Sequence, residues 1–417
     1  MKALLFAPAF APNMGSESLT ASKLALVLRR SGWDLDVISR GGQDLYSNEW
    51  TNPWNELTTC TYPLSTTNPG RLAILKERFR DTWHFKHPLP GLRWASLAED
   101  LGRRMHLSKR YDIILSRSPP DIGHLPAMML AKEFRLPWIA NWNDPPVGAW
   151  PAPYDAENGS TITQALYHRY VRHAYSMASL NTFPSIELEK HVQRHFELDQ
   201  IAKSMVIPHA SLAIPNHPID STAGFVITHA GKMTGARNPT SLLEGIQRFI
   251  TTAAPTTSEF TLQIIGHADP EFRILADRYG IGQYLQNTGP LPFSDTMETL
   301  SSSTINVLVE APCSEGIFLP GKLSDYAQAG RPILAVSPSI GVARRFLSKH
   351  GGGLHADVTS SAAIHQALVS LHDDWRNDRL EERYSTTGLA SEFSEASITK
   401  AYEMACEQAF SAHKKIR

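Results

Sequence analysis

The chain has 417 residues, a length that predicts two or three domains with full hydrophobic cores. Its formal net charge of -1 excludes the global positive field that would attract nucleic acid, so we expect no nucleic-acid partner. Cys60, Cys313 and Cys406 lack CxxC spacing, which is typical of free thiols in a reducing compartment, and no apolar run reaches the 18 or so residues of a membrane span. We therefore expect a cytoplasmic protein, at most attached to the inner face of the membrane.

Alternating strands and helices account for most of the first half. Short apolar runs predict strands at 3–7, 34–39, 112–116, 137–142 and 179–183. Periodic apolar residues predict helices at 18–30, 121–134, 160–176 and 186–195. This alternation predicts a doubly wound α/β domain over residues 1–207.

A segment at about 42–110 interrupts this pattern and is expected to be an inserted helical segment. It contains Trp50, Trp54, Trp83 and Trp94, and residues 71–110 carry ten Lys or Arg against four Asp or Glu. Basic runs are usually a solvated face. The alternative is an acceptor-binding or membrane-surface patch, because aromatic and basic residues together suit anionic lipid interfaces.

The second half repeats the alternation after a proline-containing linker at 208–222. Strands are expected at 225–230, 261–266, 284–288, 305–310 and 332–337, and helices at 239–250, 270–279, 294–302, 320–329, 340–349 and 360–372. A second parallel-sheet domain over 223–390 follows, with a last helix and basic tail at 391–417. Right-handed crossovers place the loops of both sheets at the carboxyl ends of their strands, so two facing domains with an interdomain cleft are expected.

The most informative stretch is an acid- and glycine-containing loop that follows the strand at 305–310 and runs into a helix at Pro320. Free N–H groups at a helix start favour an anion, so a diphosphate suits this loop. Glu315 and Asp325 could accept hydrogen bonds from sugar and ribose hydroxyls. The alternatives are that Glu315 only interacts with the helix dipole and that Asp325 is an ordinary exposed helix residue. Lys322 could lie near the phosphates or on the helix surface.

A second loop carries two cations. Gly231 and Lys232 follow the strand at 225–230, and Arg237 comes five residues after Lys232. Such a pair can clamp a diphosphate, with Lys as a point charge and Arg as a bidentate fork. The alternative is that both side chains are only solvated.

Together these motifs resemble the retaining nucleotide-sugar glycosyltransferases of family 4, which have the GT-B architecture of two Rossmann-like domains. The resemblance covers nearly all the chain except about 42–110. It rests on the loop from Pro12 to Gly15, on Gly231-Lys232 with Arg237, and on the block from Glu315 through Asp325 to Gly330.

The resemblance implies a role for each matching residue of the second domain. Lys232 and Arg237 match the basic pair on the donor diphosphate, in swapped order. Glu315 resembles the acid that contacts the transferred sugar, and Asp325 resembles the acid that holds the ribose. The family has Glu at this second position, and the spacing between the two acids is two residues longer here. The remaining donor-binding positions are Gly15, Gly231, Gly316, Ile317, Phe318, Leu319 and Lys322.

In the first domain, the family commonly places a His near the donor sugar, at the position of Asn143 here. Asp144 is a carboxylate at a strand end that could meet the acceptor or the sugar, and alternatively caps the following turn. Ser116, Arg117 and Ser118, at the neighbouring strand end, are weaker candidates. The histidines, including His124, His209, His229 and His267, show no metal-ligand spacing, so no metal is expected.

These inferences predict an enzyme that moves a sugar from a nucleoside diphosphate sugar to a hydroxyl acceptor with retention, without a further cofactor. A role in polysaccharide or glycoconjugate biosynthesis, with a glycan or lipid-linked acceptor, is the expectation that accompanies it. An epimerase or phosphorylase on the same architecture stays open, since a fold does not fix a function. So does a non-catalytic binding subunit, because Asn143 and Asp325 depart from the family pattern.

Overall fold

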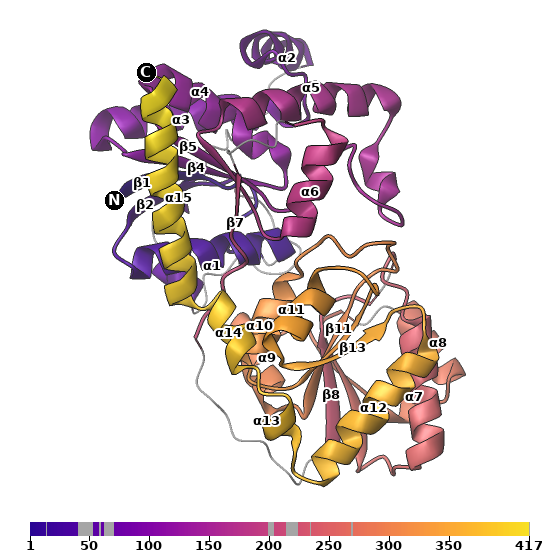
Figure 1. Cartoon of the computed structure of the whole chain (residues 1–417). Helices are drawn as coiled ribbons and strands as arrows, with labels where there is room; N and C mark the ends of the chain where they lie inside the picture. The colour runs from indigo at the N-terminus through magenta and orange to yellow at the C-terminus, as the bar shows by residue number, and fades with distance from the viewer. Residues whose placement is uncertain are drawn as a thin grey trace. The chain divides into compact units, whose positions relative to one another are not determined.

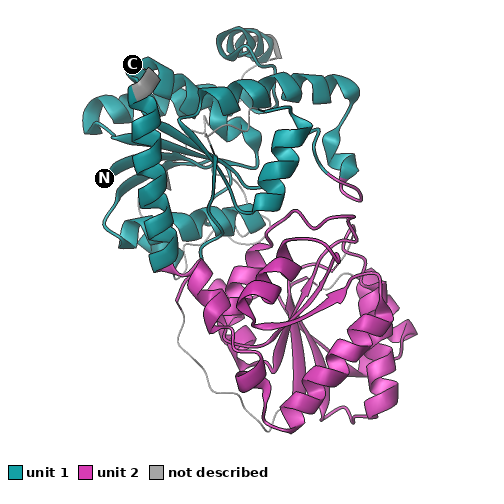
Figure 2. Ribbon diagram, viewed as in Figure 1, with its two compact units in different colours: residues 1–150, 155–210, 396–417 teal, residues 151–154, 211–395 magenta. Residues whose placement is uncertain are grey.

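The computed structural model describes residues 1–13, 15–40, 53–57, 60–61, 71–198, 204–213, 224–233, 235–267 and 270–416 (Figure 1). The chain forms two compact units, coloured separately in Figure 2. Unit 1 comprises Met1–Trp150, Asp155–Ala210 and Ala396–Arg417, and unit 2 comprises Pro151–Tyr154 and Ser211–Glu395. The last helix of the chain therefore belongs almost entirely to unit 1.

Unit 1 is built on a seven-stranded parallel sheet in the order β3-β2-β1-β4-β5-β6-β7. The strands are β1 (Lys2–Phe6), β2 (Asp34–Ile38), β3 (Cys60–Thr61), β4 (Ile113–Ser118), β5 (Trp138–Trp142), β6 (Leu180–Phe183) and β7 (Ser204–Val206). Every residue of β4 and β5 is buried, because helices cover both faces of a parallel sheet.

The helices of unit 1 lie on the two faces of this sheet; in Figure 1, α1 lies on one side of the strands and α3 and α4 lie on the other. They are α1 (Ser16–Arg30), α2 (Arg71–Phe85), α3 (Leu92–Lys109), α4 (His124–Phe134), α5 (Thr161–Met177), α6 (Ile186–His195) and α15 (Glu395–Ile416). Short 3-10 turns are η1 (Trp54–Glu56), η2 (Asp121–Gly123) and η3 (Asp155–Asn158).

Unit 2 contains a six-stranded parallel sheet in the order β10-β9-β8-β11-β12-β13. The strands are β8 (Phe225–Ala230), β9 (Phe260–Ile265), β10 (Leu285–Gly289), β11 (Ile305–Val309), β12 (Ile333–Ser337) and β13 (Gly353–Asp357). The helices are α7 (Thr240–Ala253), α8 (Pro270–Arg278), α9 (Phe293–Ser302), α10 (Gly321–Gln328), α11 (Val342–His350), α12 (Ser361–Arg376), α13 (Leu380–Arg383) and α14 (Thr387–Phe393), with a 3-10 turn η4 (Gly282–Tyr284). One core of buried side chains, among them Phe225, Phe249 and Leu368, joins β8 and β9 to α7 and α12.

The expected α/β class, with two doubly wound units, is confirmed. Five elements were not predicted from the sequence: the strands β3, β7 and β13 and the helices α13 and α14. In β13, which reads GLHAD, only Ala356 is buried, so the strand lacks the apolar run that would have predicted it. Cys313 and Cys406 are buried free thiols. Trp50, named in the sequence analysis, lies outside the described residues.

The strand orders locate one switch point in each unit. In unit 1 the order reverses between β1 and β4, and in unit 2 it reverses between β8 and β11. In open parallel sheets, ligands bind outside the carboxyl ends of the strands at such a point. The fold alone therefore predicts that ligands bind at the loops after β1, β4, β8 and β11.

Candidate functional site

In unit 2, the loop after β8 approaches the start of α10. Gly231 directly follows β8 with a φ of 113°, and its N–H donates to the Ile265 carbonyl at 2.7 Å. A Cβ atom on Gly231 would lie 2.7 Å from the Lys322 Nζ atom. This position therefore needs glycine for two reasons, its positive φ and the close approach of the lysine.

Two cations share this switch point. Burial lowers the pKa of Lys322 to about 7, and the nearby positive charge of Arg237 lowers it further, against the opposing effect of Asp325. Arg237 is half-buried, and Lys232 is exposed. The charges of Arg237 and Lys322 therefore act on each other at this switch point, and the pairing of Arg237 with Lys232 stays a prediction. A ligand with two negative charges would offset the repulsion between the paired cations.

A buried carboxyl group lies within electrostatic range of this cation pair. Glu310 follows β11 directly, and burial raises its pKa to about 7, although Arg237 opposes the shift. His229, on β8, has its pKa lowered to about 3 by burial and by the charge of Lys322, and its Nδ1 lies 2.9 Å from the Val307 carbonyl. Tyr326, on α10, accepts a hydrogen bond from the Ala230 N–H at 2.9 Å. These contacts connect β8 to β11 and to α10.

The loop from Glu315 to Leu319 is tied to the start of α11. The Gly316 N–H donates to the Ile340 carbonyl at 2.8 Å, and the Val342 N–H donates back to the Gly316 carbonyl at 2.8 Å. The Ile317 N–H donates to the Glu315 carbonyl at 3.1 Å. A phosphate contact from the amides of residues 316 and 317 would have to replace these bonds.

The side chains of this loop divide between the core and the surface. Ile317 and Leu319 are buried in unit 2, while Glu315 and Phe318 are half-buried. Asp325 is half-buried on α10, and its charge acts on Lys322 and Tyr326. The predicted residues 315–325 thus lie together with Gly231 and Arg237 around one switch point, although their individual roles stay predictions.

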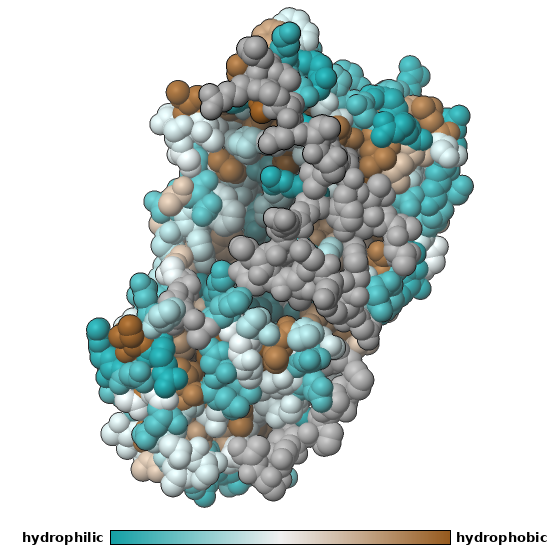
Figure 3. All heavy atoms as spheres, turned by 180° about the vertical axis from the view of Figure 1, so that it is seen from behind, coloured by the Kyte–Doolittle hydropathy of each residue, from teal (hydrophilic) through white to brown (hydrophobic). Residues whose placement is uncertain are grey.

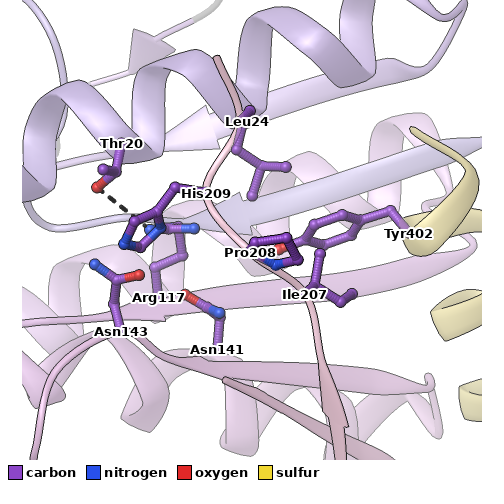
Figure 4. A pocket seen from close by; sticks show the side chains of 10 residues that line it. Thr20, Leu24, Arg117, Asn141, Asn143, Ile207, Pro208, His209 and Tyr402 are labelled. Carbon is purple, nitrogen blue, oxygen red and sulfur yellow. Dashed lines mark hydrogen bonds between the residues drawn. The ribbon is translucent and has the colours of Figure 1, made fainter. Parts of the chain in front are cut away.

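Unit 1 has a pocket beside its own switch point (Figure 4). Side chains from α1, β4, β5 and α15 meet there, together with the segment after β7. The lining residues are Thr20, Leu24, Arg117, Asn141, Asn143, Ile207, Pro208, His209, Ala210 and Tyr402. Figure 4 shows the Arg117 side chain between Thr20 and the two asparagines.

Arg117, which lines this pocket, forms a buried ion pair with Glu17. The Arg117 Nε atom donates to Glu17 Oε1 at 2.9 Å, and the two side chains are only 5% and 9% exposed. Burial raises the pKa of Glu17 to about 7, although Arg117 opposes the shift, and the negative charge of Asp144 adds to it. The Asn143 Nδ2 atom donates to Glu17 Oε2 at 2.5 Å. The carboxyl group therefore fixes the orientation of Asn143.

Asn143 presents one polar atom that the described residues leave unpaired. Its Oδ1 is buried and accepts no hydrogen bond from any residue that the structure describes. A buried acceptor without a donor is costly, so an incoming hydroxyl would satisfy it. The half-buried Asp144 follows it and acts electrostatically on Glu17 and on Asp121, a buried carboxyl group whose pKa burial raises to about 7.

The other predicted residues of unit 1 have mainly structural contacts. Gly15 is the N-cap of α1, and its N–H donates to Asn13 Oδ1 at 2.8 Å. Ser116 lies 2.8 Å from His124 Nδ1 and accepts from Trp138 Nε1 at 2.7 Å. Ser118 donates to the Asn141 carbonyl at 3.4 Å. Ser116 and Ser118 therefore help to pack the carboxyl ends of β4 and β5.

Three residues of these sites were not predicted from the sequence: Glu17, Tyr402 and Glu310. Glu17 lies two residues after Gly15, in the first turn of α1. An acidic residue directly after a glycine loop is the sequence signal that could have identified it. Tyr402 comes from α15, far along the chain, and hydrogen-bonds to Arg117, a contact that no local pattern indicates. Glu310 is the first polar residue after an apolar strand, which is the signal that was already applied to Asp144.

The part of the chain that the structure describes contains neither a candidate metal-binding cluster nor a candidate membrane-spanning helix. Within these residues, no group of three or more His, Cys, Asp or Glu side chains is arranged to hold a metal ion. Likewise, none of the helices described here combines the length and apolar character needed to span a bilayer.

Comparison with known proteins gives matches in structure only. No protein-family model and no curated protein matches this sequence. Sucrose-phosphate synthase from Thermosynechococcus elongatus is similar over 99% of both chains, with a TM-score of 0.68 and 15% identity. Anabaena HepE, solved in complex with UDP and glucose, is similar over 98% of this chain and 99% of its own, with a TM-score of 0.67 and 13% identity.

A third similar structure is described as a UDP-N-acetylglucosamine 2-epimerase from Listeria monocytogenes. It covers 98% of this chain and 97% of its own, with a TM-score of 0.57 and 13% identity. At these identities the comparisons show the fold, which is GT-B with two Rossmann-like units. Glycosyltransferases and an epimerase share that fold, so the fold does not decide which of these two activities this chain has. That decision depends on the residues of the sites.

Proposed function

We propose that this chain is a retaining glycosyltransferase related to family 4, which moves a sugar from a nucleoside diphosphate sugar to a hydroxyl acceptor. The observation that carries the proposal is the cation pair of Arg237 and Lys322 at the switch point of unit 2. Lys322 lies against Gly231, so a diphosphate placed there meets the positive charge of the lysine and can approach the backbone of the glycine closely. Lys232 supplies a further cation from the same loop.

In this proposal the bond between the anomeric carbon and the diphosphate oxygen breaks, and its electron pair leaves with the diphosphate. Arg237, Lys232 and Lys322 stabilise that departing charge, which is the main requirement of an oxocarbenium-like transition state. The acceptor oxygen bonds to the anomeric carbon on the same face, and its proton passes to the leaving diphosphate. Glu315 holds the transferred sugar and Asp325 holds the ribose.

Unit 1 is proposed to supply the acceptor side. Asn143, held by Glu17, offers an unpaired buried oxygen, and Asp144 adds a half-buried carboxylate beside it. Two such acceptors can bind and orient hydroxyl groups. A cytoplasmic enzyme of polysaccharide or glycoconjugate biosynthesis, working without a metal ion, is the setting that we propose for this chemistry.

The test begins with donor binding. A panel of UDP, GDP, ADP and dTDP sugars is titrated against the wild type, Arg237→Ala and the matched control Lys349→Ala, whose lysine is exposed on α11. We expect one nucleotide class to bind the wild type and the control, and to bind Arg237→Ala at least about tenfold more weakly. Equal binding by all three proteins would contradict the donor site.

The second step identifies the reaction. The bound donor is incubated with hydroxyl acceptors, and the anomeric configuration of the product is read by proton NMR. A glycoside with the configuration of the donor supports retaining transfer, and an inverted glycoside refutes retention. Donor binding without any turnover would favour a non-catalytic binding subunit instead.

An epimerase is the second candidate, because a structure described as a UDP-N-acetylglucosamine 2-epimerase shares the whole fold. The same binding experiment does not separate it from a transferase. Conversion of the donor to its epimer without an acceptor would support this reading. Stable donor in the absence of acceptor, with glycoside formed in its presence, would exclude it.

A further inference from the structure

Helix α2 turns a stripe of large apolar side chains toward solvent. Leu75 is 61% exposed, Phe79 is 74% exposed and Trp83 is 79% exposed. Their spacing of four residues places them on one face of the helix, in a stripe about 12 Å long. In Figure 3, the top of the molecule, where α2 lies, shows brown hydrophobic residues beside teal hydrophilic ones. Exposed apolar stripes of this kind mark interaction surfaces.

The opposite face of α2 is anchored to the rest of unit 1. Asp81 and Phe85 are buried, and the His84 ring lies 2.7 Å from Glu99 on α3. Glu77 pairs with Arg93 of α3 at 3.5 Å. At 100° per residue, Glu77 and Asp81 lie about 160° around the helix from the middle of the stripe. These contacts hold the apolar stripe outward.

The charges of α2 are sorted in the same way. Its two acids, Glu77 and Asp81, both lie on the anchored face. Lys76, Arg78 and Arg80 are exposed and flank the stripe, although Arg80 also pairs with Asp81 at 2.8 Å. On the helical wheel they lie about 60° to 100° from the middle of the stripe, on both sides of it. The outward surface is therefore apolar in its centre and cationic at its edges.

We propose that this stripe, formed by Leu75, Phe79 and Trp83 with its flanking cations, is a docking surface for an anionic lipid bilayer. Trp, Phe and Leu enter the boundary between headgroups and acyl chains, and Lys and Arg contact lipid phosphates. A second copy of the chain is a poorer occupant, because two such faces would oppose like charges. The inference does not depend on the proposed transferase activity, and it selects the membrane-surface reading of the basic segment over a solvated face.

The test measures co-sedimentation of the full chain with vesicles of phosphatidylcholine alone and of phosphatidylcholine with phosphatidylglycerol. The variants are Phe79→Ser with Trp83→Ser, and Lys76→Glu with Arg78→Glu. The matched control is Ile274→Ser, which removes an apolar side chain that is 61% exposed on α8 of unit 2. Circular dichroism and thermal melting establish that each variant is folded.

We expect the wild type and the control to bind the anionic vesicles, more weakly at high salt. Each double variant should lower the partition coefficient at least about tenfold, since one basic residue near an anionic surface contributes about fivefold. Three results would overturn the proposal: no binding by the wild type, equal binding by the folded double variants, or equal binding to both kinds of vesicle. Self-association that Phe79→Ser with Trp83→Ser abolishes, without any vesicle binding, would assign the surface to a second copy.

Discussion

Donor affinity should depend on pH through Lys322. Its pKa of about 7 in the unliganded protein means that the ammonium form is only partly populated at neutral pH. A bound diphosphate stabilises that form and raises the pKa, so binding takes up a proton in the window above pH 7. The affinity must then fall as the pH rises through that window.

The magnitude follows from the protonated fraction, which falls from about 0.9 at pH 6 to about 0.03 at pH 8.5. If only the ammonium form binds well, donor affinity falls about 30-fold, or about 2 kcal/mol, between these values. The ligand should be the nucleoside diphosphate sugar, whose diphosphate diester does not titrate in this range.

Isothermal titration calorimetry in buffers of different ionisation enthalpy measures both the affinity and the proton uptake. Lys322→Met should bind more weakly at pH 6 and show little further loss up to pH 8.5, while the control Lys349→Met should behave like the wild type. A flat affinity profile for the wild type, or a pH slope that survives in Lys322→Met, would refute the assignment.

Three further predictions concern stability and the donor loop. Glu310→Gln should raise the free energy of unfolding by about 3 kcal/mol at pH 8 and leave it nearly unchanged below pH 4.5, because burial raises the pKa of Glu310 to about 7 and the ionised form is the costly one. Urea unfolding at both pH values measures this, and an equal gain at both would contradict it. Glu17→Ala should lower the free energy of unfolding by about 3 to 5 kcal/mol at pH 8, where Glu17 is ionised, because Arg117 then stays buried without its carboxylate partner. The added change Arg117→Met should restore part of the loss, and a neutral single variant would refute the buried ion pair. Gly341→Ala should cost about 1 to 3 kcal/mol and weaken donor binding, because its Cβ would lie 2.5 Å from the Gly316 carbonyl oxygen at a φ of 152°; unchanged melting and calorimetry would contradict this.

The regular elements of the fold were predictable because their signals are local. The apolar run at 225–230 matches β8 residue for residue, and the amphipathic pattern of α6 gave the observed bounds of 186–195. The edge strand β13 was not predictable, since an edge position buries little of its sequence. Strand order was likewise absent from the local pattern, although the alternation of elements implied parallel pairing.

The candidate sites were predictable only where one loop carries the chemistry. The glycine and cations after β8 and the acid-glycine loop after β11 were recognised as neighbours of strand ends. The approach of Lys322 to Gly231 joins residues far apart in sequence, as does the contact of Asn143 with Glu17. Such contacts depend on the strand order, which brings β8 beside β11 and β1 beside β4, and no periodicity in one segment encodes them.

The central claim is that a nucleoside diphosphate sugar binds at the switch point of unit 2. Hydrogen exchange with mass spectrometry, with and without the donor selected by the binding panel, tests this most directly. The account predicts slower amide exchange in residues 229–237 and 314–326, and loss of that protection in Arg237→Ala. Protection confined to other segments, or no protection by any nucleotide sugar at saturating concentration, would contradict it.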